Sequence, residues 1–224
     1  DDMQETPQQL KALPPPLLAW YDANRRVLPW REEVSPYRTW VSEIMLQQTR
    51  VTAVLPYFAR FMEALPTVEA LAAADEQLLM ALWQGLGYYS RARNLQKAAQ
   101  AIVNEHGGVF PDTYEGLTAL PGVGDYTAGA IASIAFGQAV PAVDGNVLRV
   151  AARLDNDFTP ITDAKFKKQT RERFAALMPS DRPGDLNQSL MELGATVCLP
   201  NGAPRCADCP IQHLCEGFHR GNAA

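Results

Sequence analysis

Apolar residues recur at intervals of three and four along most of the chain, a pattern typical of helices that bury one face. Strand signals are almost absent, because no convincing run alternates apolar and polar residues and no Asn-Gly turn joins two such runs. We therefore predict an all-α fold of helices about 10 to 15 residues long with short connections. The helical stretches are Leu10–Tyr21, Trp40–Leu55, Glu76–Trp83, Leu95–Val103, Tyr126–Phe136, Val147–Leu154, Phe166–Met178 and Leu186–Val197.

Prolines and glycines fall between these stretches or at their edges, as expected of residues that end helices. They include Pro56, which we expect to mark the end of one helix, and the pair Pro121-Gly122. From their spacing we expect two helical lobes. Residues 30–140 form one lobe, and residues 1–29 with 141–224 form the other, with a cleft between them.

The composition of the 224 residues fits a globular protein, with 47% hydrophobic and 20% charged residues. No apolar run approaches the roughly 20 residues that a membrane span requires, and the amino end, DDMQETPQQL, does not resemble a signal peptide. We expect a cytoplasmic protein, associated with a bacterial nucleoid if it binds DNA, with no membrane partner. The net charge of −5 alone argues against a nucleic-acid binder.

Basic residues nevertheless cluster in three places, and a local cluster matters more for DNA binding than the charge of the whole chain. The alternative for each cluster is a helix face exposed to solvent. The clusters are Arg25, Arg26 and Arg31; Arg91, Arg93 and Lys97; and Lys165, Lys167, Lys168, Arg171 and Arg173.

Glu43 lies in the stretch SEIMLQQTR, which otherwise has the pattern of a buried helix. An ionised carboxylate moved out of water without partners costs several kcal/mol, or its pKa shifts instead. Either Glu43 faces solvent or it has a chemical task.

Two further stretches combine glycine with polar residues at a predicted helix start. In LPGVG, Gly122, Val123 and Gly124 predict a tight turn between two helices, whose N–H groups could bind an anion; a plain helical hairpin is the alternative. In VDGN, Asp144 or Asn146 could do no more than cap the next helix.

All four cysteines lie near the carboxyl end, at positions 198, 206, 209 and 215. Disulfides would be expected to be spread along the chain, so a metal site is the better interpretation. Four thiolates at this density suit zinc or an iron-sulfur cluster, and the spacing leaves both open.

Taken together, SEIMLQQTR, GLGYYSRARNL, LPGVGDYTAGAI, VDGNVLRV, NQSLMELGATVC and the cysteine set resemble the catalytic region of the MutY-type adenine DNA glycosylases. These enzymes belong to the helix-hairpin-helix superfamily that includes endonuclease III. The resemblance runs from about Leu17 to Cys215. It implies a six-helix-type lobe with a helix-hairpin-helix over about residues 113–136, and a second lobe that carries a 4Fe-4S cluster loop over residues 198–215.

The resemblance also implies a monofunctional base-excision enzyme that hydrolyses the N-glycosidic bond of adenine opposite 8-oxoguanine or guanine in double-stranded DNA, acting as a monomer. The target nucleotide is flipped out of the duplex, because a catalytic group cannot reach a stacked base. Glu43 matches the general acid and Asp144 the carboxylate that stabilises the oxocarbenium-like sugar. Tyr126, which stands where lyases of the superfamily have lysine, and Asn146 would orient Asp144 and the attacking water.

Further positions match residues that contact the substrate in the family. Gln48 would fill the gap left by the extruded base, Thr49 would lie beside the orphaned base, and Tyr88 would be inserted as a wedge; an ordinary interface tyrosine is the alternative for Tyr88. The hairpin residues Gly122, Val123 and Gly124 would bind DNA. The positions that match the adenine pocket are Arg26, Trp30, Arg31, Leu46 and Gln188.

Cys198, Cys206, Cys209 and Cys215 match the ligands of a 4Fe-4S cluster, which favours that cofactor over zinc. Seven residues separate Cys198 from Cys206, where the family pattern has six. We expect no Nudix-like domain in this chain, which leaves selectivity for the oxidised mispair open. The rival predictions are a mismatch thymine glycosylase, a DNA-binding module without catalysis, and a structural metalloprotein.

Overall fold

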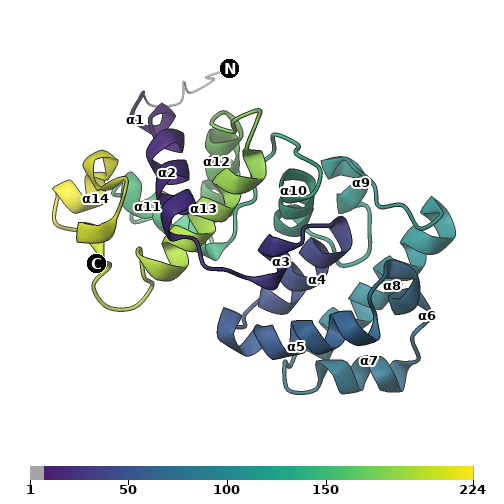
Figure 1. The fold of residues 1–224 in the computed structure, drawn as a ribbon. Helices are drawn as coiled ribbons and strands as arrows, with labels where there is room; N and C mark the ends of the chain where they lie inside the picture. Colours follow the sequence, from purple (N-terminus) through teal and green to yellow (C-terminus); the bar gives the residue numbers. More distant parts are fainter. Residues whose placement is uncertain (1–7, 224) are drawn as a thin grey trace. The chain divides into compact units, whose positions relative to one another are not determined.

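The computed structural model describes residues 8–223, and every regular element within them is helical (Figure 1). The all-α prediction is therefore confirmed. None of these helices combines the length and the apolar character that a membrane crossing needs. Residues 1–7, the start of the segment that argued against a signal peptide, lie outside the described residues.

The chain divides into two compact units. The central unit comprises residues 27–136, and the terminal unit comprises residues 8–26 and 137–223 of the described chain. The sequence prediction placed these boundaries at residues 30 and 140. The helices of the central unit are α3 (Pro29–Glu32), α4 (Pro36–Leu46), α5 (Val51–Ala64), α6 (Val68–Ala73), α7 (Glu76–Trp83), α8 (Tyr89–His106), α9 (Tyr114–Thr118) and α10 (Asp125–Ile134).

Helix α4 is the centre of the central unit. Ser35 caps its start by accepting a hydrogen bond from the Arg38 N–H at 3.1 Å, and Pro36 occupies the first turn. Residues 39–45 are all buried, because α4 contacts α3, α5, α8 and α10. Because the helix is covered on every side, even the polar Thr39, Ser42 and Glu43 are buried.

The predicted helix Trp40–Leu55 is wrong in its middle. Helix α4 ends at Leu46 and α5 begins at Val51, and between them Gln48 has a φ of +60°. Periodicity alone missed this turn, because apolar residues continue in phase on both sides of it. Pro56 was expected to end a helix but lies inside α5, where the buried Val54, Phe58 and Phe61 hold the helix in place despite the missing N–H.

Helices α9 and α10 form the predicted helical hairpin, joined by residues 119–124. Gly122 has a φ of +71°, and a Cβ at this position would lie 2.7 Å from the Cβ of Asn94 on α8, so only glycine fits. Val123 points inward and is buried. After the turn, the buried small residues of α10 allow it to pack closely on α4.

The terminal unit is built around α13, which contacts both α2 and α11 (Figure 1). Leu17 of α2, Leu148 of α11 and Leu190 of α13 belong to one buried apolar cluster. Its helices are α1 (Gln8–Lys11), α2 (Pro14–Asn24), α11 (Gly145–Leu154), α12 (Ala164–Ala175), α13 (Pro183–Thr196) and α14 (Glu216–His219), with single 3-10 turns at Cys206–Asp208 and Gln212–Leu214.

Candidate active site and cysteine cluster

Glu43 is buried on α4, with 8% of its surface exposed. The sequence left open whether it faces solvent, and the structure shows that it does not. The Tyr126 hydroxyl, at the start of α10, donates a short hydrogen bond to Glu43 Oε2. A buried carboxyl group held by a phenol is suited to proton transfer, because it is fixed in position and removed from bulk water.

Tyr126 was expected to orient Asp144, whereas the hydrogen bond found within its own unit is with Glu43. Tyr126 therefore contacts the Glu43 carboxyl group directly. Its position is set by the hairpin, because it is the second residue of α10 and immediately follows the turn.

Asp144 caps α11, as the simplest interpretation of VDGN proposed. Its Oδ1 accepts a hydrogen bond from the Val147 N–H at 2.9 Å, and its Oδ2 accepts one from Asn146 Nδ2 at 3.2 Å. Burial raises the pKa of Asp144 above its ordinary value, while these hydrogen bonds and the charge of Arg149 act in the opposite direction. The predicted partnership of Asn146 with Asp144 is present.

Asn187 of α13 fixes the extended segment that leads into Asp144. The Asn187 side chain is almost fully buried, at 1% exposed. Its Oδ1 accepts from the Ala142 N–H at 3.0 Å, and its Nδ2 donates to the Val140 carbonyl at 2.9 Å. The amide thus replaces the strand partner that this segment would otherwise need.

Arg149, one turn after Asp144 on α11, joins the same region to the cysteine loop. Its guanidinium donates to Asn146 Oδ1 at 3.0 Å, to the Gly194 carbonyl at 2.6 Å and to the Cys198 carbonyl at 3.1 Å. A Cβ at Gly194 would lie 2.8 Å from the Asn146 Cβ, so α13 and the start of α11 are in close contact here.

The residues matched to an adenine pocket are divided between the units. In the terminal unit, Arg26 forms an ion pair with the buried Glu192, with Nε 2.7 Å from Oε1. Gln188, one turn before Glu192 on α13, accepts a hydrogen bond from the Tyr21 hydroxyl at 3.2 Å. In the central unit, Trp30 packs edge-on against Phe58 with ring centroids 5.2 Å apart. Arg31 and Leu46 are partly exposed in this unit.

The residues matched to DNA contacts lie in turns of the central unit, and all but the buried Val123 are at least partly exposed. Gln48 is exposed and Thr49 partly exposed in the turn between α4 and α5, and Tyr88 is 63% exposed before α8. Tyr88 has a φ of +50°. Gly122 and Gly124 are also exposed, and Gly124 stands at the N-cap of α10, where it has no side chain to cover the helix N–H groups.

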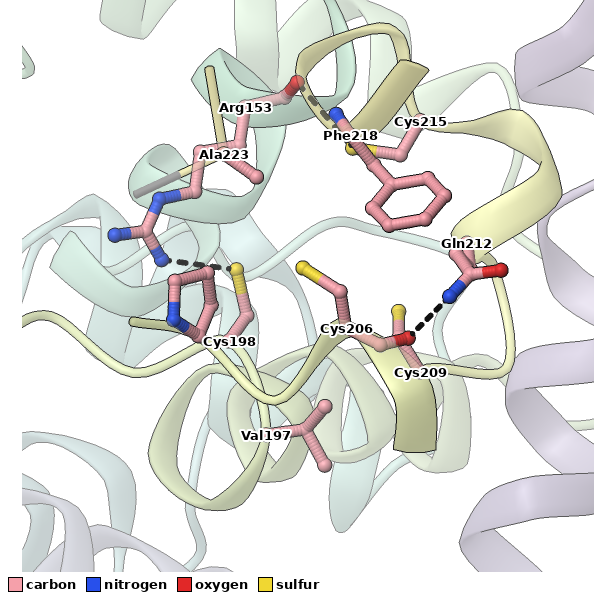
Figure 2. A pocket seen from close by; sticks show the side chains of 10 residues that line it. Arg153, Val197, Cys198, Cys206, Cys209, Gln212, Cys215, Phe218 and Ala223 are labelled. Carbon is pink, nitrogen blue, oxygen red and sulfur yellow. Dashed lines mark hydrogen bonds between the residues drawn. The ribbon is translucent and has the colours of Figure 1, made fainter. Parts of the chain in front are cut away.

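The side chains of Cys198, Cys206, Cys209 and Cys215 line one pocket of the terminal unit (Figure 2). None of them forms a disulfide. Arg153 Nη1 lies 3.1 Å from Cys198 Sγ, and the Phe218 N–H lies 3.5 Å from Cys215 Sγ. Both groups donate to sulfur, a feature that stabilises thiolate ligands.

The four thiol side chains face a common space and supply soft donors, which suit a metal group with thiolate ligands. Within residues 8–223, no three cysteine, histidine or acidic side chains are close enough together to hold one metal ion. Burial raises the pKa of Cys209 to about 11 and also raises that of Cys215, so metal binding would have to displace these protons.

Sequence reasoning named no role for Asn187, Glu192 or Arg149 and placed Arg91 only in a basic cluster. Asn187, Glu192 and Arg149 each stand next to apolar residues in the sequence, and this was the available signal. Asn187 and Glu192 each have only 1% of their surface exposed.

Comparison with known proteins gives one family. The model of the HhH-GPD superfamily of base excision DNA repair proteins matches residues 41–178. Adenine DNA glycosylases of rat and human are 48% and 47% identical to this chain over 213 residues, and that of Arabidopsis thaliana is 44% identical over 228 residues. The first two alignments cover 91% of this chain, and the chain spans about two fifths of the length of the rat and human relatives.

Solved structures share the fold. A thermostable thymine-DNA glycosylase superposes with a TM-score of 0.85 at 27% identity, covering 95% of this chain and 97% of the other. An endonuclease III trapped as a covalent intermediate with DNA superposes with a TM-score of 0.76 at 24% identity, covering 92% of this chain and 93% of the other.

Proposed function

This chain belongs to the HhH-GPD superfamily of base excision DNA repair proteins, and we propose that it hydrolyses the N-glycosidic bond of adenine mispaired with 8-oxoguanine or guanine in double-stranded DNA. The observation that carries this proposal is the buried Glu43, hydrogen-bonded by Tyr126, in a chain whose curated relatives at 36–48% identity are adenine DNA glycosylases.

Glu43 is the general acid in this proposal. A protonated Glu43 would deliver its proton to N7 of the flipped adenine and so make the base a better leaving group. Such a role requires a carboxyl group that holds its proton near neutral pH, and burial away from water favours that neutral form. The Tyr126 hydroxyl keeps the carboxyl group in one orientation.

Asp144 is the second acid and acts on the same nucleoside. Its carboxylate would stabilise the positive charge that develops on the sugar, either electrostatically or through a transient covalent bond to the anomeric carbon. Asn146 and the Val147 N–H hold both carboxylate oxygens, so the charge is presented in a fixed direction. Once adenine has left, water would attack the anomeric carbon and leave an abasic sugar in the strand.

Tyr126 also predicts the absence of strong lyase activity. A lysine at this place could form a Schiff base with the sugar and cleave the strand, and a phenol cannot. Borohydride reduction should therefore trap no stable covalent adduct with DNA in good yield.

The exposed turns would hold the distorted duplex. Gln48 would occupy the gap left by the adenine, Thr49 would contact the orphaned base, and Tyr88 would wedge beside it. Gly122, Val123 and Gly124 would bind a phosphate at the start of α10. The adenine pocket would be formed by Arg26, Trp30, Arg31, Leu46 and Gln188.

The four cysteines would hold a 4Fe-4S cluster. The pocket they line has thiol donors only among its metal-binding side chains, with hydrogen-bond donors to two of the sulfurs. When bound, the cluster would join Cys198, Cys206, Cys209 and Cys215 by iron-thiolate bonds and so fix the loop. Purified holoprotein should be brown and contain iron; a colourless protein with one zinc ion would contradict this assignment.

Removal of thymine from mispairs is the second candidate, favoured by the structural similarity to a thymine-DNA glycosylase. A duplex cleavage assay with alkali treatment separates the two. We expect release from adenine opposite 8-oxoguanine and guanine and none from thymine opposite guanine. Cleavage of the thymine strand alone would assign the second function.

A further inference from the structure

Arg91 lies on the first turn of α8, and its guanidinium faces backbone carbonyls of two different turns. One is the turn after α4, which follows Glu43, and the other is the turn before α8, which contains Tyr88. Sequence analysis placed Arg91 in a basic cluster with Arg93 and Lys97, where a solvent-exposed helix face was the alternative. The structure gives it a different environment.

The two nitrogens at the end of the side chain are divided between the two turns. Nη1 lies 2.8 Å from the Ile44 carbonyl oxygen and 2.6 Å from that of Gln47. Nη2 lies 3.3 Å from the carbonyl oxygens of both Leu86 and Gly87. The Ile44 carbonyl also accepts the Gln47 N–H at 3.3 Å and the Gln47 carbonyl accepts the Thr49 hydroxyl at 3.4 Å, so the guanidinium adds a charged donor to acceptors that otherwise have only long hydrogen bonds.

Each contacted turn contains a strained residue. Gln48 has a φ of +60° and Tyr88 a φ of +50°, and within residues 8–223 only Asn156 shares this backbone region among the residues other than glycine. The Gln47 carbonyl belongs to the peptide group that leads into Gln48, and the Gly87 carbonyl belongs to the one that leads into Tyr88. Arg91 therefore binds the peptide group before each strained residue.

The aromatic neighbours complete this arrangement. The Arg91 guanidinium carbon lies 5.5 Å from the ring centroids of both Trp83 and Tyr88. Trp83 is fully buried and donates from Nε1 to the Gly87 carbonyl at 3.1 Å. The buried Trp83 thus holds the guanidinium in place, and the guanidinium in turn contacts the exposed Tyr88 ring.

We propose that Arg91 is a positioning residue for base extrusion, which holds the turns of Gln48 and Tyr88 in their strained conformations before DNA binds. This inference rests on the proposed function, because that function places Gln48 and Tyr88 inside the duplex. Strained residues persist only where the surroundings hold them, and such residues gather at functional sites.

A direct phosphate contact is the competing role for an arginine near DNA. The charge of Arg91 is already directed at carbonyl oxygens, and burial lowers its pKa. Arg93, two residues further along α8, has a side chain 57% exposed and makes only a loose ion pair with Glu76 at 3.7 Å. Arg93 is therefore a suitable control for the loss of one positive charge.

The test compares Arg91→Lys, Arg91→Met, Arg93→Lys and Arg93→Met in the full chain. Lysine keeps the positive charge, but its single ammonium group cannot reach both turns as the two terminal nitrogens of the guanidinium do. Hydrogen-deuterium exchange of the DNA-free proteins reports residues 47–49 and 86–88. A fluorescent adenine analogue in the duplex reports extrusion, and binding is measured at several salt concentrations.

We expect the backbone amides of both turns to exchange at least about 10-fold faster in both Arg91 variants. Both variants should also extrude the base about 100-fold more slowly. Their duplex affinity and its salt dependence should stay within twofold of wild type. The Arg93 variants should extrude the base normally. Retained extrusion in Arg91→Lys, with loss in Arg91→Met and a salt slope lower by about 0.9, would instead show a phosphate contact.

A double variant separates a loss of folding from a loss of positioning. Should Arg91→Lys unfold, the double variant with Gln48→Gly is measured, because glycine adopts the left-handed conformation without strain. Recovery of folding supports the inference, and no recovery overturns it. Exchange in the DNA-free protein does not depend on glycosylase activity. If wild type releases no adenine, the proposed function fails, while unchanged exchange in Arg91→Lys defeats the role of Arg91 alone.

Discussion

Asn187→Ala tests how the segment before Asp144 is held. The change removes the acceptor of the buried Ala142 N–H and the donor to the Val140 carbonyl. A buried N–H left without a partner costs about 1–3 kcal/mol, and the part-buried carbonyl, which water can reach, adds about 1 kcal/mol. The free energy of unfolding should therefore fall by about 2–4 kcal/mol.

Urea denaturation measures this loss, with Ser189→Ala as the matched control. Ser189 is equally buried on α13, but its hydroxyl donates within the helix, to the Leu186 carbonyl at 2.7 Å. The control should lose no more than about 1 kcal/mol. Adenine release by Asn187→Ala should fall about 100-fold at a temperature where the variant is folded, because Asp144 is displaced. Equal stabilities of the two variants would refute the reasoning.

Three further predictions concern charged groups of the site. Asp144→Asn should lose adenine release and yet be more stable than wild type at pH 7. The pKa of Asp144 is raised in the folded state, so its ionised form disfavours folding at neutral pH. The difference in the free energy of unfolding between the two proteins, measured in urea, should therefore disappear as the pH falls below the ordinary pKa of 3.8. Tyr126→Phe removes the hydrogen bond that favours ionised Glu43, so the alkaline limb of the single-turnover pH profile should move to higher pH. An unmoved limb would argue against Glu43 as the acid. Glu192→Ala removes the ion pair with Arg26, and since that guanidinium is 38% exposed and can be hydrated, the free energy of unfolding should fall by only about 1–3 kcal/mol, with weaker adenine binding. No loss in the denaturation experiment would mean that the ion pair contributes nothing.

The helical class of the fold followed from periodicity, because amphipathic helices leave a direct trace in the order of residues. The turn at Gln48 could not be found in this way. Its left-handed backbone is held by the Arg91 guanidinium, whose residue is far along the chain, and no local signal marks such a contact.

The candidate site was predictable where a polar residue interrupts an apolar run. Glu43 stood out for this reason, and its burial is what the structure adds. The hydrogen bond between Tyr126 and Glu43 could not be predicted, since it depends on how α10 packs on α4, and the expected action of Tyr126 on Asp144 stays a prediction. Asn187 and Glu192 carried the same signal as Glu43, but a buried amide or ion pair is recognised only once its partners are known.

The most direct test of the account is single-turnover adenine release by wild type and Glu43→Gln, on a duplex with adenine opposite 8-oxoguanine and with duplex affinity measured in parallel. Glutamine keeps the size of the side chain and removes the transferable proton. We predict that release is lost while affinity stays within a few fold of wild type. Release at the wild-type rate by Glu43→Gln would contradict the central claim.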